Sequence, residues 1–401
     1  MAEVAGPWLT IVGIGEDGPA GLSAASRDAL DRAERVFGAS RHLSLLPDLR
    51  DRAVVWPVPF DAGLPLLLAE RGRPVVMLAS GDPFWFGAGS VLTRHLAPAE
   101  WVAHPVPGSF ALAAARLGWP LEETACLGLH AAPLSRLRSV LASGRQALVL
   151  LRDGAAVRDV AQYLDEHGFG ASTMSVLEAL GGPRERIRST LACDFALTDV
   201  AHPVAVGIDI AGEGAVLPAA SGLPNEWFEH DGQITKRPVR ALTLSALAPR
   251  PGELLWDIGA GSGSIGIEWL LTHPSTRAIG FEADPARAAR ARANASALGV
   301  DRLNVIEGTA PAILAEQPLP DAVFVGGGLS AALLDTLWAT LRPGTRLVAN
   351  AVTLESEALL AERHAAHGGS LLRIELAEAA PLGRRRGWQA SYPVVQWSVT
   401  R

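Results

Sequence analysis

Residues 253–271 read ELLWDIGAGSGSIGIEWLL, and this stretch decides how the C-terminal half of the sequence is expected to fold. The run Glu253–Ile258 predicts a buried β-strand, and Ile267–Leu271 predicts an apolar helix. The turn between them is rich in glycine. Such a turn lets a ligand approach the backbone, and the helix that follows presents unpaired N–H groups to it. We therefore expect an α/β fold with a cofactor loop after this strand.

Two acidic residues bear on which ligand this loop binds. Asp257 ends the strand just before Gly259, where dinucleotide-binding folds usually have an apolar residue. Glu282 ends the next expected strand, 277–282, where its carboxylate can accept both hydroxyls of a ribose. An acid at that place also occurs in NAD-binding proteins, so Glu282 alone decides little. The whole pattern favours S-adenosylmethionine over a dinucleotide or a merely tight turn, with cofactor contacts expected at Asp257, Gly259, Gly261, Gly263 and Glu282.

Further strands in this half are expected at 303–306, 321–328, 347–353, 371–376 and 394–399. Ala310 follows the first of them, at the place where an adenine is usually contacted. Three glycines end the second, at the sheet edge where ligands bind in open α/β folds, although a flexible loop is an alternative reading. This order of strands resembles the class I methyltransferase fold, a Rossmann-like α/β sheet, with a final hairpin.

The N-terminal half contains three turns of related composition. The run Trp8–Ile14 predicts a strand that includes Gly13 and leads to Gly15. Residues 74–81 predict a second strand, which leads into a Gly-Asp-Pro turn, and the sequence Pro-Gly-Ser-Phe at 107–110 opens a helix expected at 111–117. The first turn alone is weak evidence, because a phosphate site would account for it equally well.

The length of 401 residues predicts two domains. The stretch 211–224, AGEGAVLPAASGLP, predicts a linker between an α/β domain of residues 1–210 and another of residues 225–401. No apolar run approaches the roughly 20 residues of a membrane span, and no signal peptide is recognised, so no membrane partner is expected. Two cysteines, Cys126 and Cys193, indicate neither a disulfide framework nor a metal site, which favours a cytoplasmic protein.

The net charge of −7 argues against a nucleic-acid partner. Lys236 is the only lysine, so an anionic substrate must be held mostly by arginine, which binds carboxylates through two parallel hydrogen bonds. Charge runs are usually solvated surface, but three clusters are candidates for substrate binding, the last of them as a carboxylate clamp: Lys236, Arg237 and Arg240; Arg184, Arg186 and Arg188; and Arg384, Arg385 and Arg386.

Taken together, the three turns of the N-terminal half resemble the tetrapyrrole methylase family, in which two lobes enclose a cofactor cleft. The resemblance covers about residues 8–210 and implies that the first turn, with Gly13 and Gly15, faces the tetrapyrrole. The usual proline of that turn is replaced around Glu16–Asp17. The phrase GGPRERI at 181–187 is similar to the subgroup called CbiE, which methylates C5 of a precorrin. The cofactor contacts that this resemblance implies are Gly81, Asp82, Pro83, Ser109 and Phe110.

Residues 228–247, FEHDGQITKRPVRALTLSAL, resemble the start of the decarboxylating precorrin methyltransferase domain called CbiT. This resemblance extends from about Gly222 to Arg401. It implies that Thr235 lies over the cofactor, S-adenosylmethionine, and we expect the neighbouring Lys236 to contact the substrate. It also implies a homo-oligomer.

The two resemblances in one chain imply a bifunctional methyltransferase of cobalamin biosynthesis. The N-terminal domain is expected to methylate C5 of precorrin-6B; the C-terminal domain is expected to methylate C15 and to remove the C12 acetate carboxyl group, giving precorrin-8. Because the conjugated ring is nucleophilic at these carbons and can take up the electrons of decarboxylation, the protein supplies mainly proximity and orientation, and we assign no catalytic residue. Two alternatives stay open: a methyltransferase of RNA or protein, and a tetrapyrrole carrier or sensor without catalysis.

Overall fold

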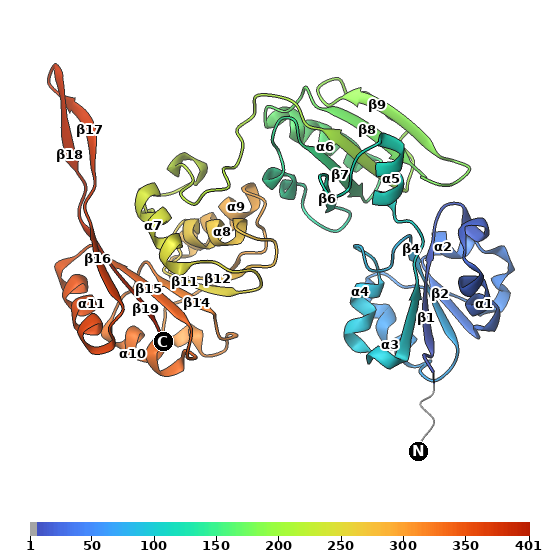
Figure 1. Ribbon diagram of the computed structural model, residues 1–401, viewed down its shortest axis with the longest axis horizontal. Helices are drawn as coiled ribbons and strands as arrows, with labels where there is room; N and C mark the ends of the chain where they lie inside the picture. Colours follow the sequence, from blue (N-terminus) through green and yellow to red (C-terminus); the bar gives the residue numbers. More distant parts are fainter. Residues whose placement is uncertain (1–5) are drawn as a thin grey trace. The chain divides into compact units, whose positions relative to one another are not determined.

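The computed structural model describes residues 6–401, and its contacts divide the chain into two compact units. The first unit extends to Ala215 except for Ser135–Ser139, which belong to the second unit with Val216–Arg401. Both units are α/β, as predicted (Figure 1). No helix among the described residues is long and apolar enough to cross a membrane.

The first unit begins with a lobe built on five parallel strands in the order β3-β2-β4-β1-β5. Apolar side chains cover both faces of this sheet, which is typical of parallel strands. The Ser23 hydroxyl caps the first helix by accepting a hydrogen bond from the Ser26 N–H at 3.1 Å. The elements are β1 (Leu9–Ile14), α1 (Ala24–Arg32), β2 (Arg35–Gly38), α2 (Ser40–Ser44), β3 (Ala53–Val55), α3 (Leu64–Leu68), β4 (Val75–Ser80), α4 (Gly89–Leu92) and β5 (Trp101–His104).

The second lobe of this unit has a sheet in the order β6-β7-β10-β8-β9, in which β6 and β7 are parallel and the other pairs are antiparallel. The helix expected at 111–117 begins two residues earlier, directly after Gly108, and ends at Leu117, before Gly118. Its buried Phe110 packs in a core with strand residues of the same lobe. The elements are α5 (Ser109–Leu117), β6 (Ala125–Gly128), β7 (Gln146–Leu151), α6 (Ala155–Glu166), β8 (Thr173–Glu178), β9 (Arg186–Leu191) and β10 (Val204–Asp209).

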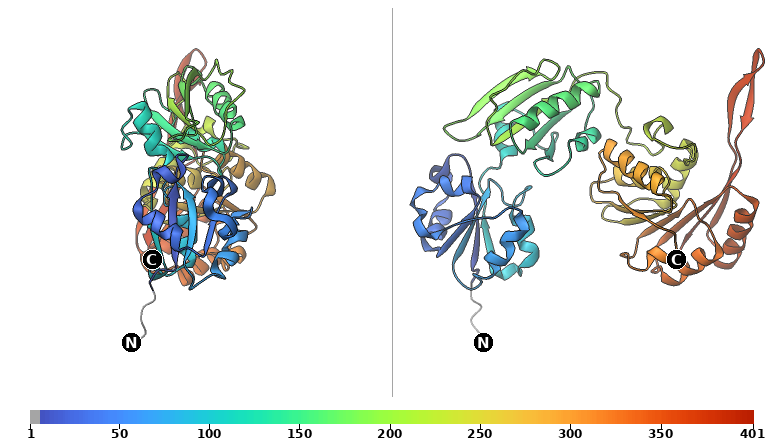
Figure 2. Two further views of the ribbon diagram at one scale, coloured as in Figure 1. Left: turned by 90° about the vertical axis from the view of Figure 1, so that its right-hand side faces the viewer. Right: turned by 180° about the vertical axis from the view of Figure 1, so that it is seen from behind.

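The second unit has a seven-stranded sheet in the order β13-β12-β11-β14-β15-β19-β16. The first five strands are parallel, and β16 and β19 form the expected antiparallel pair. Helices cover both faces (Figure 2), each over its own apolar core. The elements are α7 (Arg237–Leu247), β11 (Leu254–Ile258), α8 (Ser264–Leu271), β12 (Arg277–Glu282), α9 (Pro285–Ala297), β13 (Asn304–Glu307), β14 (Ala322–Val325), α10 (Ala331–Thr340), β15 (Arg346–Ala351), α11 (Leu354–His367), β16 (Ser370–Ile374) and β19 (Val394–Thr400).

A second hairpin, which the sequence did not predict, is inserted between β16 and β19. Its strands β17 (Ala377–Leu382) and β18 (Arg385–Ala390) form a sheet of their own and extend away from the seven-stranded sheet (Figures 1 and 2). Large apolar side chains on and beside it are exposed: Leu382 is 70% exposed, Trp388 81% and Tyr392 88%. The hairpin therefore contributes little to the core of its own unit.

Candidate functional site

The glycine loop after β11 lies at the carboxyl edge of the parallel strands and touches the glycine run after β14. Gly259 has a φ of +71°, and a Cβ added there would lie 2.5 Å from the Gly327 nitrogen. A side chain at Gly259 would therefore separate the two loops. This close packing of two backbone segments leaves main-chain groups at the edge where ligands bind in open α/β sheets.

The two predicted carboxylates of this site both hold the loop. The buried Asp257 accepts a hydrogen bond from the Gly266 N–H at 2.9 Å, and Glu282 accepts one from the Gly261 N–H at 2.8 Å. Burial raises the pKa of Asp257 to about 7 against the lowering effect of the Gly266 N–H, and the charge of Glu282 adds to the increase. Each Glu282 oxygen has a second lone pair, so this side chain fits the role of binding ribose hydroxyls.

The predicted adenine position lies next to Glu282. The Gly308 N–H donates to the Glu282 carbonyl at 2.9 Å, which brings the turn after β13 to the end of β12. Ala310 follows in this turn and packs, half-buried, on the apolar core that includes Phe281. The structure therefore brings together Asp257, Gly259, Gly261, Gly263, Glu282 and Ala310 at one edge of the sheet.

The segment 222–236, which we call the lead-in segment, is fixed to the same unit by a buried ion pair. Arg240 on α7 and Glu268 on α8 are 0% and 4% exposed, and Arg240 Nε lies 2.5 Å from Glu268 Oε1. Glu268 also accepts the N–H groups of Gly222 and Leu223 at 2.6 and 2.9 Å. The expectation that Arg240 belongs to a substrate-binding cluster is wrong, because its guanidinium group is buried and committed to this pair.

The same guanidinium group fixes the predicted Thr235. Arg240 Nη1 donates to the Thr235 carbonyl, which leaves Thr235 half-buried and Lys236 exposed at the start of α7. A second tie comes from Asn294 on α9, whose amide donates to the carbonyls of Glu229 and Ser262, both at 2.9 Å. Ser262 belongs to the glycine loop, so the lead-in segment is held beside it.

The first unit contains a cleft of about 1080 Å³ lined by residues of both lobes. The Gly-Asp-Pro turn and the Pro-Gly turn meet in it: Gly81 has a φ of +56°, and a Cβ there would lie 2.6 Å from Gly108 Cα. The predicted first turn joins them, because a Cβ at Gly13 would lie 2.0 Å from the Gly81 oxygen. Three turns far apart in the sequence thus form one backbone surface.

The predicted residues of this unit fall into two groups. Gly15, Gly81, Asp82, Ser109 and Phe110 line the cleft. Gly13 and Pro83 are not among the lining residues: Gly13 allows the close approach of the first turn, and the Pro83 carbonyl accepts the Gly89 N–H at 2.9 Å.

The sequence did not single out a polar group at the carboxyl edge of β2 and β4, formed by Arg41, His42 and Ser80, all of which line the cleft. His42 Nε2 lies 2.8 Å from Ser80 Oγ and 2.9 Å from Arg41 Nη2. Burial, and next to it the charge of Arg41, lowers the pKa of His42 to about 4, so its imidazole is neutral near pH 7. The available signal was the Arg-His pair just after the strand 35–38, at the edge where parallel sheets bind ligands.

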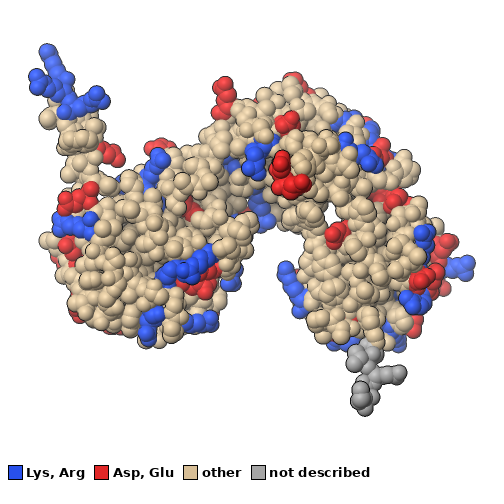
Figure 3. Space-filling model, in the orientation of Figure 1, with Lys and Arg blue, Asp and Glu red and all other residues tan. Residues whose placement is uncertain are grey.

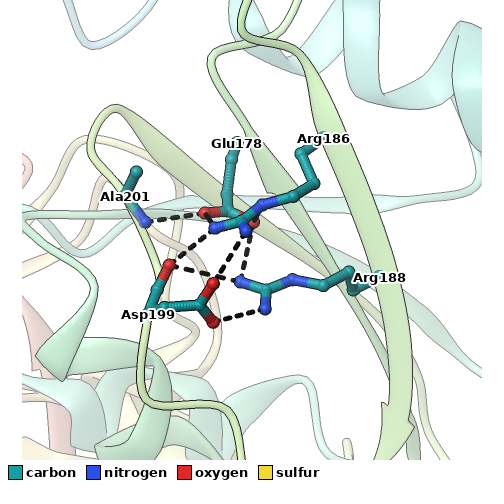
Figure 4. A network of polar contacts seen from close by, with 5 residues as sticks. All are labelled: Glu178, Arg186, Arg188, Asp199 and Ala201. Atoms are coloured by element: carbon teal, nitrogen blue, oxygen red, sulfur yellow. Dashed lines mark hydrogen bonds and ion pairs between the residues drawn. The ribbon is translucent and has the colours of Figure 1, made fainter.

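Two arginines proposed for substrate binding belong to a structural network instead (Figure 4). Arg186 and Arg188 on β9 both donate to the buried Glu178, at 2.7 and 2.9 Å, and to Asp199, at 2.8 and 2.6 Å. Hydrogen bonds from Arg188 and Arg186 lower the pKa of Asp199 to about 2. The Ala201 N–H completes the network at 2.6 Å from Glu178. Both guanidinium groups therefore have structural partners within the second lobe.

The third cluster lies apart from the glycine loop. Arg384, Arg385 and Arg386 are exposed at the turn of the β17–β18 hairpin, and Figure 3 shows basic side chains at its tip. Because the hairpin extends away from the seven-stranded sheet, the structure does not gather these arginines with the cofactor loop.

Two protein families match separate ranges of the chain. The family described as tetrapyrrole (corrin/porphyrin) methylases matches residues 8–195, and the precorrin methyltransferase domain matches residues 226–401. The fold is thus that of a tetrapyrrole methylase joined to a precorrin methyltransferase domain.

The chain is 50% identical over 403 residues to the precorrin-6Y C(5,15)-methyltransferase (decarboxylating) of Sinorhizobium sp., covering 99% of this chain and 97% of the relative. It is 41% identical to the protein of the same name from Mycobacterium tuberculosis, covering 98% and 100%. A solved C-terminal domain of the Rhodobacter capsulatus precorrin-6Y C5,15-methyltransferase is 58% identical, covers 46% of this chain and all of that domain, and has a TM-score of 0.45. The chain belongs to the family of precorrin-6Y C(5,15)-methyltransferases (decarboxylating).

Proposed function

We propose that this chain transfers methyl groups from S-adenosylmethionine to C5 and C15 of precorrin-6B and removes the C12 acetate carboxyl group. The observation that carries the proposal is the identity of 50% along almost the whole length of a relative whose name contains both methylation positions and the decarboxylation. Two glycine-loop sites of unrelated design in one chain support it, because two methylations on different carbons suit two sites.

We assign the C5 methylation to the cleft of the first unit and the C15 reaction with decarboxylation to the second unit. S-adenosylmethionine, when bound, supplies an electrophilic methyl group. The residues of the chain bind and orient: Glu282 and the loop at Gly259 hold the cofactor, and Thr235 lies beside it. In the first unit, the backbone at Gly81 and Gly108 holds the cofactor. Alignment of the methyl group with the ring carbon accounts for the acceleration.

The test is mass spectrometry of precorrin-6B after incubation with the intact chain and methyl-labelled S-adenosylmethionine. The expected product carries two labelled methyl groups and has lost one carbon dioxide. If the mass of the macrocycle is unchanged while the chain still binds S-adenosylmethionine, the proposed substrate is refuted and the proposed cofactor is not. Label recovered in added RNA or protein would support the alternative acceptors, and binding without transfer would support a carrier.

We also propose a homo-oligomer. The β17–β18 hairpin exposes Leu382, Trp388 and nearby Tyr392, an apolar surface of a kind that marks interaction sites. Light scattering from the intact chain is expected to give a mass above that of one 42.0 kDa subunit. A single-subunit mass would contradict this part of the proposal alone.

A further inference from the structure

A polar cluster at the mouth of the first-unit cleft is formed from three neighbouring strands. Glu16 follows β1, Arg41 follows β2, and Ser80 ends β4, which lies between them in the sheet. All three line the cleft. Arg41 donates to Glu16 through Nη1 and to Ser80 Oγ through Nη2, the latter at 2.9 Å. Glu16 belongs to the first turn, where the usual proline of the tetrapyrrole methylase pattern is replaced around Glu16–Asp17, so the cluster includes this departure from the pattern.

Glu16 joins the two lobes of the unit. Its side chain is 6% exposed, and its second oxygen accepts a hydrogen bond from Nη2 of Arg184, in the turn between β8 and β9, at 2.9 Å. The turn approaches closely, because a Cβ at Gly182 would lie 2.5 Å from Glu16 Cβ. The carboxylate of Glu16 is therefore shared between one arginine inside the cleft and one on the neighbouring lobe.

The two arginines differ in what else they reach. The Arg41 side chain is 26% exposed and lines the cleft, whereas that of Arg184 is 63% exposed and is not among the lining residues. The described contacts of Arg41 use Nη1 and Nη2, and a guanidinium group has five N–H donors, so donors remain for a ligand. Neutral His42 accepts one of these bonds and adds no charge, which leaves Arg41 as the cation at this place.

We propose that Arg41 binds a peripheral carboxylate of the tetrapyrrole in the first-unit cleft, and that Glu16 is the positioning residue that holds Arg41 for this contact. The inference rests on the function proposed above. Arg152, the other arginine that lines the cleft, is paired with Asp153 and its side chain is 75% exposed, so it lacks such a support. His42 and Ser80 occupy both Nη2 hydrogens and Glu16 one Nη1 hydrogen, so the planar fork keeps its Nε–H and its second Nη1–H, each of which can donate one bond to a carboxylate from a fixed position.

The test compares R41Q with R184Q in the intact chain, because both variants remove one partner of Glu16 and only the first removes a lining residue. C5 methylation of precorrin-6B is measured by mass spectrometry while each substrate is varied in turn. R41Q is expected to raise KM for the tetrapyrrole by about 10- to 100-fold, as for loss of a hydrogen-bonded charge, and to change KM for S-adenosylmethionine by less than about 2-fold. R184Q is expected to raise neither by more than about 3-fold.

Three results would overturn the inference: an unchanged KM for the tetrapyrrole in R41Q, an equal rise in R184Q, or a rise for S-adenosylmethionine instead, which would assign the carboxylate to the methyl donor. R41K keeps the positive charge beside Glu16 but lacks the planar guanidinium group, so it provides a second test if R41Q does not fold. Its KM is expected to rise several-fold, and an unchanged value in folded R41K would also overturn the inference. Failure of the wild-type chain to methylate the macrocycle would instead refute the proposed function.

Discussion

At the scale of single residues, Asp257 links the cofactor loop to the stability of the second unit. The pKa of its carboxyl group is about 7 in the folded chain, and the unfolded chain has the ordinary aspartate pKa of 3.8. The folded state therefore binds more protons between these values, so the free energy of unfolding falls as pH rises through this window. An isosteric D257N variant lacks this titration and can still accept the Gly266 N–H.

We expect the free energy of unfolding of D257N, relative to wild type, to increase by about 2–3 kcal/mol from about pH 5 to pH 8. Hydrogen exchange of the β11 amides in the intact chain, measured across that range, reports the local value. A difference between the two proteins that does not change with pH would show that the buried carboxyl group is ionised throughout.

At the scale of elements, the Arg240–Glu268 pair fixes the lead-in segment to helices α7 and α8. Removing Arg240 leaves the buried Glu268 without its counter-ion, and we expect R240M to lower the free energy of unfolding by about 3–5 kcal/mol. Because Arg240 also holds the Thr235 carbonyl, R240M is expected to weaken binding of S-adenosylmethionine to the second unit. Urea unfolding and titration calorimetry of the intact chain measure the two effects.

A matched control for that prediction lies in the same segment. Arg287 donates to Asp231 at 2.8 Å, and both side chains are about one-third exposed, at 29% and 31%. Exposed pairs contribute little, so R287Q is expected to cost at most about 1 kcal/mol and to leave cofactor binding unchanged. If R240M and R287Q lower the free energy of unfolding and the affinity for the cofactor equally, burial of the Arg240–Glu268 pair is not what fixes the lead-in segment.

At the scale of the whole molecule, the two proposed sites lie on separate units, and each glycine loop has a position where an added Cβ would meet backbone atoms. G81V is expected to abolish C5 methylation and to spare C15 methylation with decarboxylation, and G259V is expected to do the reverse. Mass spectrometry of precorrin-6B incubated with each full-length variant distinguishes the products. G72V, at an exposed glycine with a φ of +90° and open space around it, controls for backbone strain alone. Loss of both methylations in G259V would show that the first unit requires the product of the second.

The sequence predicted the parallel strands of the second unit well, because strands buried on both faces are continuous apolar runs: β12 occupies the predicted 277–282, and β14 ends at Val325, before its glycine run. It did not predict which charges pair. Glu16 and Arg184 are 168 positions apart, and Arg240 and Glu268 are 28 apart, so their contacts depend on how the elements pack. For the same reason, residues that are neighbours in the predicted cation clusters differ in the structure: some form buried ion pairs and others are exposed on the surface.

The single lysine makes the lead-in segment directly observable. Lys236 is exposed at the start of α7, so a protease that cleaves only after lysine has one peptide bond to attack in the entire chain, Lys236–Arg237. Cleavage requires local opening of a segment that Arg240 and Asn294 hold in place, so its rate reads out that opening. The rate of cleavage at Lys236 therefore measures the opening of the lead-in segment without any engineered label. A ligand whose binding holds this segment closed is expected to slow the cleavage of the chain into two fragments.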